Sequence, residues 1–144
     1  MREAVGSTFL FKIMIIFIFF FASFLAIAIN YSQAFRIKNQ VINLIEQYEG
    51  LNDTSEAKIF NLINSSGYYR EINSCNGYGN PVSNPDTETQ INGLCVRRFT
   101  TGIDDTDAYY SITTFVSFNL PIVGNFFTFP VKGETKVITN DTGA

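Results

Sequence analysis

The hydrophobic residues are concentrated in one long run near the N-terminus. No charged residue lies between Ile13 and Ile29, and Ser23 is the only polar side chain there. Extended back to Thr8 across Lys12, the run reaches the length of about 20 residues with which a helix crosses the hydrocarbon core of a bilayer. It is apolar on every side, so lipid or closely packed helices must surround it. We therefore expect a membrane-spanning helix, with Lys12 near one end reaching toward the headgroups.

The pattern changes after residue 29 from uniformly apolar to amphipathic. Residues 30–48 contain neither Pro nor Gly, and Glu49 and Gly50 supply a typical helix end. Apolar positions spaced by three and four residues form a seam along one helix face, made of Ala34, Ile37, Val41, Leu44 and Tyr48. We expect both parts to form one rod from residue 5 to residue 49, roughly 65 Å long. Its second half would cover the core of a globular head.

A second, shorter helix is predicted to follow. Asp53 is a suitable N-cap, with Glu56 three residues later as its reciprocal partner. Ala57, Phe60 and Ile63 would form the inner face of this helix. The polar segment 64–67, which closes on a glycine, predicts its end.

The remaining chain separates into a polar loop and an alternating, strand-forming third. Residues 73–93 are rich in Asn, Gly, Pro, Ser and Thr without periodicity, which predicts a long loop. Strands are expected at 96–101 and at 109–120, where apolar and polar residues alternate as in a half-buried antiparallel strand. The alternation resumes at 127–131, and Gly133 indicates a bulge before a short strand at 135–138. Residues 139–144 are expected to fray.

Together these elements predict an α+β fold in which a long N-terminal helix packs on a small antiparallel sheet. Residues 1–30 would form the membrane-spanning helix with a short leader. Residues 31–144 would form an extracytoplasmic head, of which 31–49 continue the helix. The sheet is expected to be a meander of three or four strands whose apolar face lies on residues 34–48.

Two cysteines lie in the polar part of the head. A disulfide between Cys75 and Cys95 would pin the ends of the long loop and stabilise the fold by about 3 kcal/mol on the loop-entropy model. The alternative is two free thiols. Basic residues are nearly balanced on the two sides of the apolar run, so charge does not orient it. A disulfide is most useful in an oxidising compartment, which favours a cytoplasmic N-terminus and an extracytoplasmic head.

Composition narrows the classes of function. The chain has 144 residues, a formal net charge of −3 and no His, which excludes His-based catalytic pairs and His metal ligands. The acidic balance argues against a nucleic-acid partner, and we expect no enzyme activity and no cofactor. Asp104, Asp105 and Asp107 are weak candidates for calcium, but they lack the EF-hand spacing. An acidic, solvated hairpin tip is the favoured interpretation.

A cleavable secretory signal is an alternative to the retained anchor. Residues 26–28 read Ala-Ile-Ala, which matches a signal-peptidase site and would place a cut after Ala28. The apolar run is longer than the usual stretch of about 7–15 residues in such signals. The helical pattern also continues beyond it without a break. A retained anchor is therefore the preferred interpretation.

The layout resembles type IV pilin-like proteins, in particular TadE-like pseudopilins and minor pilins. The resemblance is carried by the charged leader Arg2–Thr8, with Gly6 just before the apolar helix, and by Val116–Gly124 followed by residues 127–135. The second stretch is similar to the C-terminal strand–Pro–strand hairpin of TadE-like proteins. The resemblance implies cleavage by a prepilin peptidase between Gly6 and Ser7. The family's Glu five residues after the cut is replaced here by Phe11.

Besides membrane lipid, the partners that this resemblance implies are copies of the same chain or other pilin-like subunits, bound through the N-terminal helix. An all-apolar helix leaves the bilayer only when similar helices replace the lipid around it. Glu3 of a neighbouring subunit is a candidate partner for Lys12, provided that the leader is retained. The packing would be supplied by Phe17, Phe19, Phe20, Phe21 and Phe24.

The function expected on these grounds is that of a structural subunit of a surface filament or of its assembly machinery. The subunit would be held in the membrane by its N-terminal helix before assembly. The alternative is a single-pass membrane protein whose extracytoplasmic domain binds or adheres without polymerising.

Overall fold

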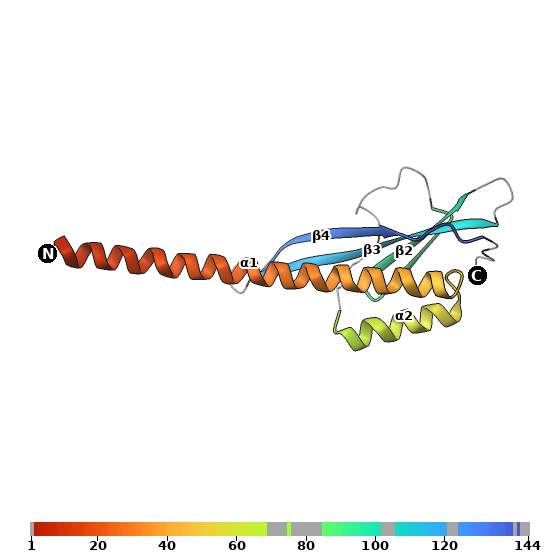
Figure 1. Cartoon of the computed structure of the whole chain (residues 1–144), viewed down its shortest axis with the longest axis horizontal. Coiled ribbons are helices and arrows are strands. Elements are labelled where there is room, and N and C mark those ends of the chain that lie inside the picture. Colours follow the sequence, from red (N-terminus) through yellow and green to blue (C-terminus); the bar gives the residue numbers. More distant parts are fainter. Residues whose placement is uncertain are drawn as a thin grey trace.

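The structure is a computed structural model that describes residues 2–68, 75, 85–101, 106–120, 124–139 and 141, with backbone alone for 2–4, 118–120 and 124–127. A long helix and a short one are followed by an antiparallel sheet (Figure 1). The elements are α1 (Arg2–Gln47), α2 (Asp53–Ser66), β1 (Thr87–Ile91), β2 (Leu94–Thr101), β3 (Asp107–Leu120) and β4 (Gly124–Glu134). The expected α+β fold, with a long N-terminal helix on a small antiparallel sheet, is confirmed.

Helix α1 is a single rod of 46 residues, which corresponds to about 69 Å. Its C-terminal half lies across β3 and β4, while its N-terminal half projects beyond the head (Figure 1). Helix α2 lies beside α1 and contacts β1. The apolar and amphipathic parts of the sequence are thus two halves of one continuous helix.

The sheet is a meander in the order β1-β2-β3-β4, with every neighbouring pair antiparallel. Strand β1 corrects the prediction of an uninterrupted loop over 73–93. It is an edge strand with mostly exposed polar residues, and Ile91 is its one buried side chain, so it lacks an apolar alternation. Asn92 and Gly93 both have positive φ (43° and 82°), as the tight turn into β2 requires.

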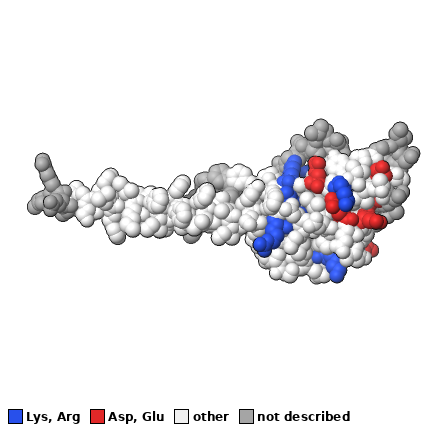
Figure 2. All heavy atoms as spheres, viewed as in Figure 1, with Lys and Arg blue, Asp and Glu red and all other residues white. Residues whose placement is uncertain are grey.

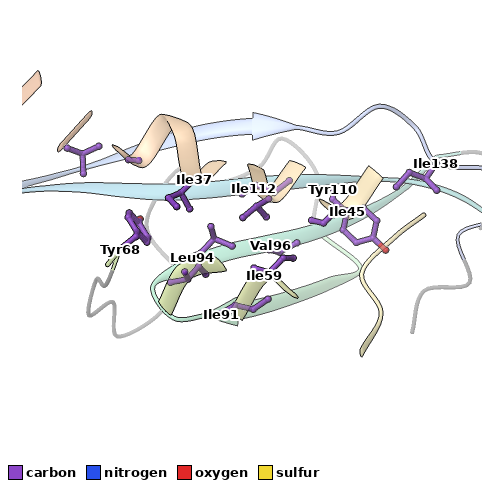
Figure 3. Close-up of a cluster of buried hydrophobic side chains, with 14 residues drawn as sticks. Ile37, Ile45, Ile59, Tyr68, Ile91, Leu94, Val96, Tyr110, Ile112 and Ile138 are labelled. Carbon is purple, nitrogen blue, oxygen red and sulfur yellow. The ribbon is translucent and has the colours of Figure 1, made fainter. Parts of the chain in front are cut away.

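The main core lies between α1, α2 and the sheet (Figure 3). Helix α1 contributes Ala34, Ile37, Val41 and Ile45, whereas Leu44 is only partly buried. Tyr48, which was predicted to belong to the seam, lies just after α1 and is also partly exposed. The seam therefore departs from the predicted heptad spacing, because a straight helix of 3.6 residues per turn lies on a sheet here rather than coiling around another helix.

Helix α2 begins one residue earlier than predicted. Its N-cap is Asn52, whose side chain accepts a hydrogen bond from Ser55 N at 2.9 Å, while Ser55 Oγ accepts one from Asn52 N at 2.8 Å. Asp53 and Glu56 are instead acidic residues of the first turn. The predicted end is confirmed, because Gly67 closes the helix at φ 68°.

The inner face of α2 also differs from the prediction. The buried residues are Ser55, Ile59 and Ile63, at intervals of one helical turn. Ala57 is exposed, and Phe60 is 47% exposed. The predicted face took its apolar residues at steps of three, which drift around a helix of 3.6 residues per turn.

Strand β3 is buried on both faces over most of its length, which corrects the prediction of a half-buried strand. Tyr110, Ile112 and Val116 face the main core, and Phe115 packs with the two cysteines on the opposite face. The predicted bulge at Gly133 is absent from the described register, where Gly133 pairs with Ile112. The irregularity lies instead between residues 118 and 119.

Candidate membrane-anchoring helix and its support

The N-terminal half of α1, residues 5–29, is exposed along its length apart from the partly buried Ser23, and forms the bare half of the helix. Within the described chain, α1 is the one helix long and apolar enough to cross a membrane, and none of its most apolar window is buried. Figure 2 shows the same rod without a charged side chain on the face in view, whereas charges are distributed over the head. The helix predicted to span a membrane is therefore present, bare and long and apolar enough to do so.

The phenylalanines of this bare half all point outward. Their exposed fractions range from 54% for Phe21 to 72% for Phe20. Rings of Phe17 and Phe21 stack at a centroid distance of 6.4 Å. At about 100° per residue, one stripe within roughly 100° of arc holds four of them, and Phe19 lies on the far side. The stripe consists of Phe17, Phe20, Phe21 and Phe24.

The polar side chains within the apolar run bond to their own helix. Ser23 Oγ donates to Phe19 O at 2.9 Å, and Asn30 Nδ2 donates to Ala26 O at 3.0 Å. Such bonds to the carbonyl four residues earlier satisfy a polar group without water. The bare half is therefore compatible with a hydrocarbon surrounding, in which an unsatisfied donor is costly.

Lys12 is the one charged residue between Ala4 and Arg36. It lies beside Val5, Thr8 and Phe9 on the helix surface. The next acidic residue along α1 is Glu46. The Glu3 side chain lies outside the described side chains, and nine residues of helix separate it from Lys12 by about 13 Å along the axis. A contact between these two groups therefore requires a second copy of the chain.

The two predicted cleavage sites both lie within α1. Gly6 and Ser7 belong to an exposed turn, and a Cβ added at Gly6 would meet no atom within 4 Å. Ala28 lies in the middle of the continuous helix, at the level where the head begins. Cleavage at either site stays a prediction.

A groove forms where the β3–β4 hairpin meets α1. Phe24, Ile27, Ala28 and Tyr31 line its helix side, and Val116, Phe129, Pro130 and Val131 line its sheet side. These surfaces are almost entirely apolar. The apolar surface of the bare helix therefore continues onto the head at this groove.

Above the groove, β4 approaches α1 closely at Gly133. A Cβ at this position would lie 2.8 Å from both Ile42 Cδ1 and Lys38 Cδ. Lys38 is 8% exposed, and its Nζ lies 4.2 Å from the centre of the Phe35 ring. Gly133 thus lets the lysine stem pack between helix and strand, with the charge over an aromatic face.

The predicted disulfide between Cys75 and Cys95 is present, with a Cα–Cα distance of 5.9 Å. Both cysteines are buried and pack with Phe115 on the sheet face opposite α1. Arg97 supports this cluster by donating to Cys75 O at 2.8 Å and by pairing with Glu88 on β1. The bridge therefore fixes Cys75 to the face of the sheet opposite α1.

Asp141 is buried at 6% exposure, which corrects the prediction of a frayed tail at this position. Its Oδ2 accepts hydrogen bonds from Arg98 Nε at 2.7 Å and from Tyr110 Oη at 2.8 Å. Gly50, at φ 132°, leaves room for the carboxylate, since a Cβ there would lie 2.5 Å from Asp141 Oδ1. Asp141 is thus tied to the end of the head distant from the bare helix.

The contacts around Asp141 shift the pKa values of Arg98 and Tyr110. The hydrogen bond to Asp141 raises the pKa of Arg98 above its usual value. Burial raises the pKa of Tyr110, and the carboxylate beside it acts in the same direction. Arg97 and Arg98 point to opposite faces of the sheet, toward Cys75 and Asp141, and form no basic patch.

The acidic candidates for calcium are only partly described. Asp107 begins β3, and its carbonyl accepts a hydrogen bond from Thr101 Oγ1 at 3.2 Å. Asp104 and Asp105 lie outside the described residues. Among the residues that are described, no three Asp, Glu, Cys or His side chains gather in a way that could hold a metal ion.

Two features of the site were missed in the sequence. The groove depends on the β3–β4 hairpin reaching back along α1, and no local pattern gives that register. The Asp141 cluster joins residues 98, 110 and 141, which are distant in sequence.

Comparisons with protein-family models, curated proteins and solved structures find no match for this chain.

Proposed function

We propose that this protein is a membrane-anchored structural subunit, pilin-like in architecture, that assembles through its N-terminal helix into a surface filament or into the machinery that builds one. The observation that carries the proposal is the division of α1 into two halves. One half is buried under the sheet, and the other is bare and apolar on every side. Such a helix needs lipid before assembly and other helices afterwards.

The proposed orientation has the N-terminus in the cytoplasm and the head outside. The Cys75–Cys95 bridge supports it, because disulfides persist in oxidising compartments. The resemblance to TadE-like proteins adds the charged leader, with processing between Gly6 and Ser7. If the leader is retained, Glu3 of one subunit pairs with Lys12 of the next, which offsets the penalty of burying Lys12 among apolar helices.

A photo-crosslinking residue placed at Phe20 tests self-association directly. Phe20 is 72% exposed on the bare half, and Phe60, at 47% exposure on α2, is the matched control in the head. Full-length chain produced in cells is irradiated, and its membrane and surface fractions are analysed by denaturing gel. We expect crosslinks between copies for the probe at Phe20 and none for the probe at Phe60.

Two other outcomes contradict parts of the proposal. Crosslinks from neither position, with the chain retained in the membrane, would contradict assembly through the helix and favour a non-polymerising, membrane-anchored binding domain. Recovery of a soluble chain beginning at Ile29 would contradict the retained anchor and support cleavage after Ala28. N-terminal sequencing of the mature protein distinguishes this from a cut at Gly6.

A further inference from the structure

The β3–β4 hairpin has a position that the proposed function does not use. We propose that, while the chain is anchored, this hairpin lies in the outer interfacial layer of the membrane beside α1, and that lipid acyl chains fill the groove between them. The inference rests on the membrane anchorage in the proposed function and is independent of filament assembly.

The length of α1 sets the depth of the groove. The helix carries no charge from Ile13 to Phe35, a span of about 34 Å against a hydrocarbon core of about 30 Å. With Lys12 at the inner boundary, a hydrocarbon core of about 20 residues ends near residue 32. Ile27, Ala28 and Tyr31 of the groove then lie within about 8 Å of the outer boundary. The hairpin residues that line the same groove lie at a similar depth.

The charge pattern of the hairpin matches that depth. No charged residue lies between Ala108 and Val131, a stretch that covers most of β3 and β4 and the residues between them in the sequence. Charges return at Lys132 on β4 and at Arg36 on α1, both exposed. Lys132 directly precedes Gly133, against which Lys38 packs. The basic residues of β4 and α1 therefore lie at nearly the same height along the axis of α1. A basic border above an apolar layer is what anionic lipid headgroups attract.

The exposure of two groove residues and the strand pairing of the hairpin also favour lipid as the occupant of the groove. Tyr31 lines the groove from α1 and Phe129 lines it from β4, at 53% and 52% exposure, an apolar surface that water disfavours. The described pairing of β2 with β3 ends at Cys95 and Thr113. Beyond that point the described strand partner of β3 is β4, and such a two-stranded hairpin depends on packing against other apolar surfaces, here α1 on one face. An interfacial position removes the apolar faces of this hairpin from water.

The sequence contains no Trp, so the fluorescence of a single introduced Trp reports one position of the protein. Three full-length variants are placed singly in phosphatidylcholine vesicles whose chains carry bromine, a Trp quencher, either near the headgroups or near the chain ends. F129W reports the hairpin, and F20W reports the anchor. V137W is the matched head control, since Val137 is 50% exposed.

F129W is expected to lose about half of its emission to bromine near the headgroups, as for a side chain at the headgroup–acyl boundary, and less to bromine near the chain ends. F20W should be quenched most by the deeper bromine, and V137W by neither. Emission from F129W that matches V137W, while F20W is quenched, would overturn the hairpin position and leave the anchor standing. Lack of quenching of F20W would overturn the anchorage itself.

A second copy of the chain is the competing occupant of the groove. Each measurement is therefore repeated over a series of protein-to-lipid ratios. Quenching of F129W that is constant across the series supports lipid. Quenching that falls as protein increases, with blue-shifted emission, would show that another subunit covers the groove and would overturn the proposal.

Discussion

At the end of the head remote from the bare helix, hydrogen bonds join single residues that are far apart in the sequence. Asp141 holds Arg98 and Tyr110, and Gly50 leaves room for its carboxylate. Sequence pattern predicts none of these contacts, because each joins residues without a shared period or motif. The pattern did predict the disulfide between Cys75 and Cys95, since those were the two available thiols.

Replacing Asp141 by Asn tests this cluster. The substitution keeps the size of the side chain but removes the charge that pairs with Arg98, whose side chain is 14% exposed. We expect the free energy of unfolding to fall by about 2 kcal/mol, the range of a hydrogen bond to a charged group. Chemical denaturation of the full chain in detergent measures it. Glu134→Gln, at an exposed site on β4, is the control, and equal stability of the two variants would refute the role of Asp141.

Tyr110 gives the cluster a dependence on alkaline pH. Its pKa is raised in the folded state by burial, so the unfolded chain loses this proton first as pH rises. The stability that the neutral phenol contributes is therefore fully present below the usual tyrosine pKa of about 10 and is lost above it. Denaturation curves across this range should show a smaller loss for Tyr110→Phe than for the unchanged chain. Parallel losses in both proteins would contradict the assignment.

Whole elements were predicted best where one physical requirement extends over many residues. The apolar run and the amphipathic stretch after it predicted α1, and alternation predicted β3 and β4. Strand β1 was missed because it is an edge strand held by pairing with β2, with a single buried residue. The start of α2 was misplaced because Asn52, one residue before the predicted cap, takes that role. Its inner face was misplaced because the predicted residues were spaced by three, whereas the buried ones are spaced by four.

Close packing of two elements is tested by Gly133→Ala. The added Cβ would lie 2.8 Å from the side chains of Ile42 and Lys38, so both side chains must shift. Overpacking of this kind costs about 1–2 kcal/mol. Thermal unfolding of the head measures the change. Gly6→Ala, where the new Cβ meets nothing within 4 Å, should leave it unaltered, and equal unfolding temperatures would argue against the close approach.

The disulfide joins the segment at Cys75 to the sheet across a sequence separation of 20. Its removal is expected to lower the free energy of unfolding by about 3 kcal/mol, mainly by freeing the unfolded chain. The comparison is between oxidised protein and the Cys75→Ser, Cys95→Ser double variant, both in detergent. Reductant should destabilise the oxidised protein alone. Unchanged stability of the double variant would contradict this account of the bridge.

The whole molecule is a rod with a head at one end. The uniformly apolar part and the amphipathic part of α1 occupy opposite halves of that rod. The apolar half of α1 is not covered by any other element of the described chain, and the other half packs on the sheet as part of the head's core. The sequence predicted this division, but it did not reveal that the β3–β4 hairpin returns along the helix to the border between the two halves. That position follows from strand register, which depends on tertiary contacts.

The central claim is that the bare half of α1 packs against copies of itself in a surface filament. The most direct measurement is electron microscopy of material sheared from producing cells, with the chain identified by gold-labelled antibody. We predict labelled filaments from the unchanged chain and from Phe60→Ala, and strongly reduced filaments from Phe20→Ala, which stays anchored in the membrane. Unlabelled filaments, or labelled filaments that are equally abundant in both variants, would contradict the account.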